Sequence, residues 1–158
     1  MSALLGRQAI HALKALLELA AAPSAWRSVN ELASAQALPA PMLEQLLLRL
    51  RRARLLEARR GRTGGYRLAL PASEIPLTAV LAALSPPPAS VQELTAEAPQ
   101  AGAAPPEQVA ADRVAAVLNQ RLRRALQREL ERCSLADLLH DLRSTRASLS
   151  EEGGLLIG

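Results

Sequence analysis

The sequence predicts a mainly α-helical fold with one small β-hairpin, on three observations. Of the 158 residues 49% are hydrophobic, yet phenylalanine is absent and there is one tryptophan and one tyrosine. The core must therefore consist of leucine, alanine and valine, a set that favours helices. Apolar residues recur at helical spacing over most of the chain. A glycine-rich stretch between two short apolar-polar segments is typical of a hairpin.

The N-terminal part predicts three helices. The first ends at Pro23, and its apolar face is expected to comprise Leu4, Ile10, Leu13, Leu16, Leu17 and Ala20. A second begins at Ser28, with Glu31 completing a capping box, and stops near Gln36. Proline suits the first turn of a third helix, at about 41–52, with Leu43, Leu46, Leu47 and Leu50 buried. Two short helices across a four-residue connection are a helix-turn-helix candidate.

Residues 55–70 predict a hairpin around the turn Gly61-Arg62-Thr63-Gly64-Gly65. A hairpin directly after a helix-turn-helix is called a wing. Apolar residues at helical spacing then resume, and this part of the chain ends near residue 85. These residues are Leu77, Val80, Leu81 and Leu84. Residues 1–85 are thus expected to form a winged helix-turn-helix domain.

The rest of the chain predicts a linker and a long helix. Residues 86–106 hold six of the eleven prolines and read as a linker. Residues 107–143 hold a long amphipathic helix and a short final helix that Ser134 and Asp137 cap. Such a long helix can bury the apolar residues along one of its sides only against a partner or its own copy. We therefore expect dimerisation through Val114, Val117, Leu118, Leu122, Leu126 and Leu130. Residues 144–158 are expected to be a flexible tail.

Positive charge is concentrated in one segment. The chain has a net charge of +4, but residues 49–67 carry eight arginines and one acid, Glu57, which leaves −3 for the remainder. A concentrated basic patch is the footprint of a polyanionic partner.

Several protein classes are excluded. The single cysteine, Cys133, rules out a disulfide framework, and it and the two histidines, His11 and His140, leave no metal cage. No apolar run approaches the about 20 residues of a membrane span, and charged residues stand where a signal sequence needs an apolar stretch, so a cytoplasmic protein is expected. No nucleophile–base pair occurs, and the glycine turn lacks the lysine of a nucleotide-binding loop, so an enzyme is not expected.

Four segments together resemble the Rrf2 family of bacterial winged-helix transcription regulators, the type of IscR, NsrR and CymR. They are Pro41–Leu46, Arg49–Leu55, Arg60–Leu68 and Ile75–Val80. The opening Gly6–Ile10 and the segment Leu130–Leu138 resemble the family's first helix and the segment after its dimerisation helix. The resemblance implies a homodimer that places one helix of each protomer in the major groove and a wing in the minor groove of DNA.

One departure from the family concerns the cofactor. Members often bind an iron–sulfur cluster through three cysteines between the winged domain and the dimerisation helix. Residues 86–106 contain neither cysteine nor histidine, so no cofactor is expected. Cys133 is interpreted as a small apolar residue, with a redox sensor or an intermolecular disulfide as the alternatives. Any effector is expected to act at the linker or the dimerisation helix.

Candidate DNA contacts follow from side-chain chemistry. Gln45 can pair with an adenine edge and Glu44 can accept from a cytosine amino group, while Arg49 and Arg52 suit phosphates. Arg60 is the first choice for the minor groove, where negative potential is enhanced. The full expected set is Ser28, Pro41, Met42, Glu44, Gln45, Arg49, Arg52, Arg59, Arg60, Arg62, Thr63, Gly64 and Gly65. The alternative function is a protein-interaction module on a winged-helix scaffold whose DNA binding is vestigial.

Overall fold

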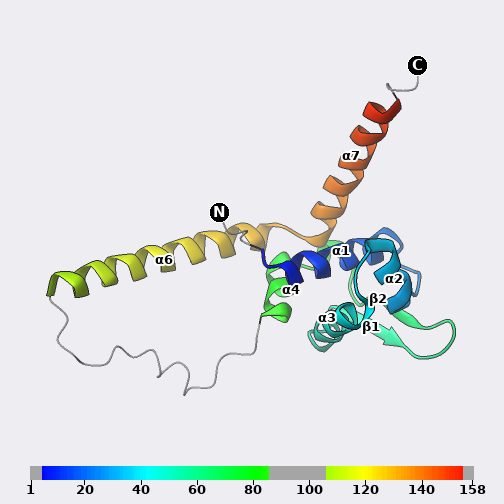
Figure 1. Ribbon diagram of the computed structural model, residues 1–158, viewed down its shortest axis with the longest axis horizontal. Helices are drawn as coiled ribbons and strands as arrows, with labels where there is room; N and C mark the ends of the chain where they lie inside the picture. The colour runs from blue at the N-terminus through cyan, green and yellow to red at the C-terminus, as the bar shows by residue number, and fades with distance from the viewer. Residues whose placement is uncertain (1–4, 86–105, 155–158) are drawn as a thin grey trace. The chain divides into compact units, whose positions relative to one another are not determined.

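The computed structural model describes residues 5–85 and 106–154 (Figure 1). The chain divides into two compact units. One comprises Met1–Leu84 together with Leu130–Gly158, and the other comprises Ser85–Glu129. Apart from Pro106, the expected linker lies outside the described residues, as does Leu4 of the expected first helix.

The three expected N-terminal helices are present as α1 (Arg7–Ala21), α2 (Val29–Gln36) and α3 (Ala40–Arg52). The expected face of α1 is wrong in one respect, because Ile10 is 40% exposed. The buried face is Ala12, Ala15, Leu16, Leu19 and Ala20. Periodicity alone leaves the exact face open, and here packing favours a side rich in small alanines, which lets neighbouring helices approach closely.

Helix α3 depends on burial rather than on capping. Its N-cap, Pro39, offers no side-chain hydrogen bond, whereas all four expected leucines are buried. Loss of a cap costs about 1 kcal/mol, but burial of a leucine side chain contributes about 1.5–3 kcal/mol. The leucine face therefore determines which side of α3 faces the core, and the opposite side remains exposed.

The predicted wing is confirmed as an antiparallel hairpin of β1 (Leu56–Arg59) and β2 (Gly65–Leu68). Leu56 pairs with Leu68 and Arg59 with Gly65. The segment before α2 adds a further rung to β2, because the Arg27 N–H donates to the Tyr66 carbonyl (3.0 Å) and the Tyr66 N–H donates to the Arg27 carbonyl (2.8 Å). The wing is thereby joined by backbone to the helix-turn-helix.

The last elements of this unit are a 3-10 turn η1 (Ala72–Glu74), α4 (Leu77–Leu84) and α7 (Leu135–Gly154). The Ser134 cap is confirmed: its hydroxyl and N–H both donate to an Asp137 carboxylate oxygen, at 2.8 and 2.7 Å. Leu135 and Leu139 are buried in the same core as the leucines of α1 and α3. The start of α7 thus belongs with the winged domain and not, as expected, with the long helix.

The predicted flexible tail is wrong over residues 144–154. Figure 1 shows α7 as one uninterrupted helix, which ends at Gly154. Residues 143–150 are exposed, and hydroxyl groups of this stretch donate to carbonyls four residues earlier. Because polar residues predominate there, hydropathy periodicity gave no signal for the continuation. Residues 155–158 lie outside the described part.

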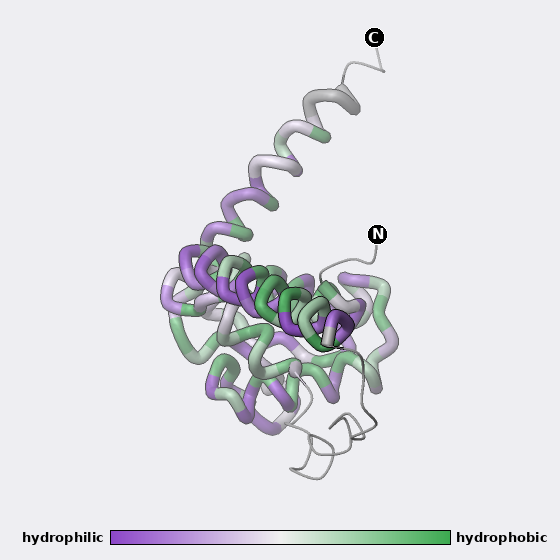
Figure 2. The backbone as a smooth tube through the Cα atoms, turned by 90° about the vertical axis from the view of Figure 1, so that its left-hand side faces the viewer, coloured by the Kyte–Doolittle hydropathy of each residue, from purple (hydrophilic) through white to green (hydrophobic). Residues whose placement is uncertain are grey.

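The other unit contains most of α6 (Pro106–Arg132). Apolar and polar residues alternate along its length in Figure 2. Of its six expected dimerisation residues, five are between 43% and 70% exposed in the single chain; these are Val114, Val117, Leu118, Leu122 and Leu126. Leu130 is half-buried. None of the helices in residues 5–85 and 106–154 has the length and apolar character of a membrane span.

Candidate nucleic-acid interface

The outer side of α3 presents polar and charged groups. Glu44, Gln45 and Arg52 are exposed, as is Pro41, whereas Met42 is half-buried. Because the leucines on the opposite side are fixed in the core, these side chains keep a defined orientation. They lie on the helix that follows the turn, where a helix-turn-helix protein reads bases.

Arg49 points elsewhere. Its Nη1 atom donates to the Leu84 carbonyl and to Gln8 Oε1, both at 3.4 Å. The first of these bonds satisfies one of the open carbonyls at the C-terminus of α4. Arg49 therefore connects α3 to the ends of α1 and α4, so this structure gives it a structural task beside the expected phosphate contact.

The wing turn offers two arginines. Arg60, Arg62 and Thr63 are exposed, and within the described part of the chain neither Arg60 nor Arg62 makes a hydrogen bond or ion pair. Both guanidinium groups are therefore available to a ligand.

Two positions of the wing turn require glycine for steric reasons. A Cβ at Gly64 would collide with the carbonyl of Arg59, and one at Gly65 would collide with the carbonyl of Arg27. The turn is therefore closely packed at these two glycines.

Arg59 lies differently from its neighbours. Its Nη2 atom donates to the Thr63 carbonyl at 2.6 Å, across the turn, and its Cζ atom lies 4.6 Å from the centroid of the Trp26 ring. Arg67 lies 4.5 Å from the same centroid and forms an ion pair with Glu57 at 3.0 Å. The sequence analysis assigned no role to Trp26 or Arg67. The feature that could have indicated one is the single tryptophan two residues before the N-cap of α2.

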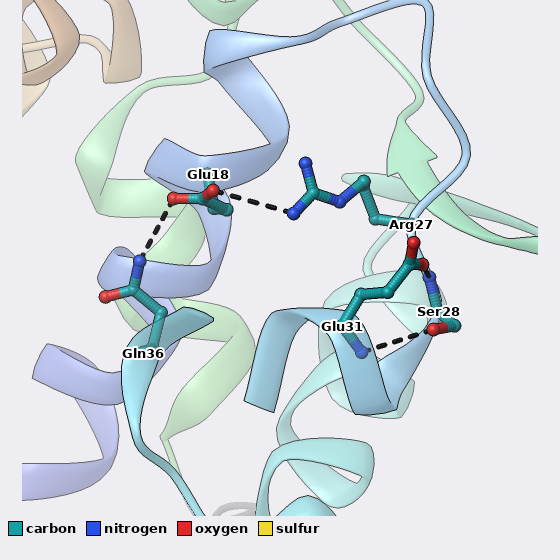
Figure 3. Close-up of polar contacts among 5 residues, drawn as sticks. All are labelled: Glu18, Arg27, Ser28, Glu31 and Gln36. Atoms are coloured by element: carbon teal, nitrogen blue, oxygen red, sulfur yellow. Dashed lines mark hydrogen bonds and ion pairs between the residues drawn. The ribbon is translucent and has the colours of Figure 1, made fainter. Parts of the chain in front are cut away.

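A polar network holds the segment between α1 and α2 (Figure 3). Glu18 of α1 pairs with Arg27 at 3.6 Å and accepts a hydrogen bond from Gln36 at 3.1 Å. The Ser28 N–H donates to the Glu31 carboxylate at 2.6 Å, and the Glu31 N–H donates to the Ser28 hydroxyl. The predicted capping box is confirmed, and hydrogen bonds from the Ser28 N–H and the Ser28 hydroxyl lower the pKa of the Glu31 carboxyl below its usual value.

Tyr66 lies on β2 and is affected by charged side chains of α3. It is buried at the wing base. Burial raises the pKa of its phenol, with a smaller contribution from the nearby negative charge of Glu44. Arg51 acts on the same group in the opposite direction. Exposed α3 side chains and the base of the wing are therefore close enough to share one electrostatic environment.

These features define a class of protein. A helix-turn-helix with an exposed second helix, followed directly by a basic hairpin, is the architecture of winged-helix DNA-binding regulators. Residues 5–141 match the sequence profile of the Rrf2 family, described as iron-dependent transcriptional regulators. The chain belongs to the Rrf2 family and is a transcriptional regulator of that type.

Individual relatives agree with this assignment. The candidate HTH-type transcriptional regulator slr0846 of Synechocystis sp. is 37% identical over 142 residues, which cover 89% of this chain and 90% of the relative. The HTH-type transcriptional regulator IscR of Cereibacter sphaeroides is 42% identical over 77 residues, which cover 47% of this chain and 50% of the relative.

Solved structures share the fold. The IscR of T. potens matches with a TM-score of 0.68 and 23% identity over 90% of each chain. CymR (YrzC), the global cysteine regulator of B. subtilis, matches with a TM-score of 0.64 and 26% identity. That match covers 86% of this chain and 95% of CymR.

Proposed function

We propose that the protein is a homodimeric, sequence-specific regulator of double-stranded DNA that inserts α3 in the major groove and the wing, residues 59–67, in the minor groove. One observation carries this proposal. The exposed side of α3 and the unpaired arginines of the wing turn belong to one compact unit, in which the Arg27–Tyr66 backbone pair and the buried Tyr66 hold wing and helices together.

Each exposed group has a chemical task in this proposal. Gln45 reads an adenine edge and Glu44 accepts from cytosine or repels other bases. Arg52 holds a phosphate, which positions the protein without reading sequence. Arg60 enters the minor groove, where a guanidinium gains from the enhanced negative potential. Ser28 caps α2 first and supplies at most a secondary phosphate contact.

Dimerisation is proposed to proceed through α6. Its valines and leucines recur every three or four residues on one stripe and are exposed in the single chain, and an isolated amphipathic helix gains stability by covering such a stripe. Pairing of two copies requires a pseudo-palindromic operator whose half-sites lie about one helical turn, ~10 bp, apart.

The regulator is proposed to work without an iron–sulfur cluster. Such clusters are held by sets of cysteine thiolates, and the whole chain contains one cysteine, the half-buried Cys133. Within residues 5–85 and 106–154, no three histidine, cysteine, aspartate or glutamate side chains gather into a possible metal site. The donor set therefore does not fit the iron dependence in the family's description.

The test begins with selection of bound fragments from a genomic library by the full-length protein at physiological salt. Arg60→Ala is then titrated against the selected duplex by gel shift. A base-edge contact predicts a loss of about 1–3 kcal/mol; equal affinity would remove Arg60 from the interface. Arg143→Ala, an exposed arginine on α7, is the control for lost charge.

Salt dependence separates the proposal from a protein-interaction module. Several phosphate contacts require the logarithm of affinity to fall steeply with the logarithm of salt concentration. Failure to select any duplex, or a flat salt dependence, would favour the interaction module.

A further inference from the structure

Trp26 lies against two guanidinium groups that belong to the wing. The Cζ atoms of Arg59 and Arg67 are 4.6 and 4.5 Å from its ring centroid, well inside the about 6 Å range of a cation–π contact. We call Trp26, Arg59 and Arg67 the Trp26 clamp. Trp26 is the sole tryptophan of the chain and is half-buried.

The clamp resolves a charge conflict on the hairpin. Arg59 and Arg67 come from adjacent strands, and the register pairs Arg67 with Glu57 and Arg59 with Gly65. Because side chains alternate along strands, both arginines lie on one face as diagonal neighbours. Two like charges repel there, and the negative face of the Trp26 ring and the carboxylate of Glu57 offset that repulsion.

The ring and the arginines have different anchors. The backbone of Arg27, next to Trp26, pairs with Tyr66, and the following Ser28 caps α2. The ring is therefore held at the start of the helix-turn-helix. Arg59 in turn closes the wing turn through its 2.6 Å hydrogen bond to the Thr63 carbonyl. The clamp thus links the position of α2 to the shape of the turn.

We propose that Trp26 is a positioning residue for DNA binding: by holding Arg59 against the turn, it pre-forms the wing so that Arg60 and Arg62 project toward the duplex. This inference rests on the proposed function. It also gives Arg59, which is exposed, a supporting role in the wing turn in place of the expected DNA contact. A binding-competent conformation that is already populated avoids the loss of affinity that ordering on binding would impose.

The expected effect is moderate. A cation–π contact at an exposed site corresponds to roughly a two- to fivefold change in an equilibrium. Without the ring, a fraction of the wings is no longer competent, and apparent affinity falls in proportion to that fraction. We expect about a three- to tenfold weaker affinity of Trp26→Leu for the selected duplex.

The first test compares Trp26→Leu and Trp26→Tyr in the full chain, titrated against that duplex at several salt concentrations. Tyrosine keeps an aromatic face, so it should return affinity to within about twofold of the parent. The salt slope of Trp26→Leu should equal the parent's, because the bound complex makes the same phosphate contacts. Parental affinity of Trp26→Leu, no rescue by tyrosine, or a slope lowered by about one would each overturn the proposal.

The second test needs no DNA and keeps Trp26. In the free protein, Arg59→Gln should increase quenching of Trp26 fluorescence by acrylamide, since the ring loses one of the two guanidinium groups that lie over it, while Arg143→Gln should not. Unchanged quenching in Arg59→Gln would overturn the clamp. If the clamp is present but the parent selects no duplex, the proposed function fails and the clamp does not.

Discussion

The backbone of Gly65 packs so closely against the carbonyl of Arg27 that no side chain fits between them. A Cβ at this glycine would collide with the carbonyl and with the backbone nitrogen of Ser28, and its φ of +140° is one that other residues rarely adopt. At this glycine β2 packs against the segment before α2. A glycine is therefore needed for the wing to lie against the helix-turn-helix in this way.

Replacement of Gly65 should disturb the packing of the wing against the segment before α2. Backbone strain of this kind costs of order 1–3 kcal/mol, and the collision adds to it, so Gly65→Ala should lower the free energy of unfolding by more than about 2 kcal/mol. Gly61 is the matched control, because its φ is also positive (+109°) but nothing lies within 4 Å of an added Cβ. Urea unfolding followed by circular dichroism measures both. Equal losses in the two variants would contradict the close packing at Gly65.

Alanine variants of Arg49 and Arg52 should have different effects, because Arg49 has a structural role and Arg52 is the proposed phosphate contact. Arg49 donates to the Leu84 carbonyl, so Arg49→Ala should lower the free energy of unfolding by about 0.5–1.5 kcal/mol. Exposed Arg52 is the proposed phosphate contact, so Arg52→Ala should leave stability near the parental value and reduce the salt slope of DNA binding by about one. If Arg52→Ala lowered the stability and Arg49→Ala reduced the salt slope instead, the two proposed roles would be reversed.

Two helix caps should make stability fall in acid. Hydrogen bonds from Ser28 and Ser134 lower the pKa values of Glu31 and Asp137 in the folded protein. The unfolded chain therefore binds protons at higher pH than the folded one, and the stabilisation, complete at neutral pH, is lost as the pH falls below about 4. The double variant Glu31→Gln, Asp137→Asn should show a weaker decline of Tm between pH 6 and 3. A parallel decline in variant and parent would show that the caps contribute nothing to it.

The exposed stripe of α6 should control oligomeric state. Leu118 and Leu122 are 56% and 61% exposed in the single chain, so Leu118→Asp with Leu122→Asp should leave the fold of the winged domain intact and convert a dimer into a monomer. Sedimentation velocity measures the mass, and near-parental Tm of the winged domain is the control. A variant that remains dimeric would remove this stripe from the interface.

Sequence reasoning succeeded where one local signal sufficed. The Ser28–Glu31 box, the proline in the first turn of α3 and the glycines of the wing each determine an element boundary by themselves. Amphipathic spacing likewise identified the leucines of α3.

What the sequence did not indicate depends on tertiary packing. The burial of alanines rather than Ile10 on α1, the reach of Arg59 to Trp26 and the direction of Arg49 depend on which element packs against which. Spacing along one helix or strand does not contain that information. The helical continuation to Gly154 was missed because an exposed polar helix has no apolar face to detect.

The most direct test of the central claim is hydroxyl-radical footprinting of the selected duplex with the full-length protein. Two protomers, each with α3 in the major groove and a wing in the minor groove, predict two equivalent protected regions related by two-fold symmetry and about one helical turn, ~10 bp, apart. Arg60→Ala should weaken protection only at the outer, minor-groove positions. A single asymmetric footprint, or protection unaffected by the wing, would contradict the account.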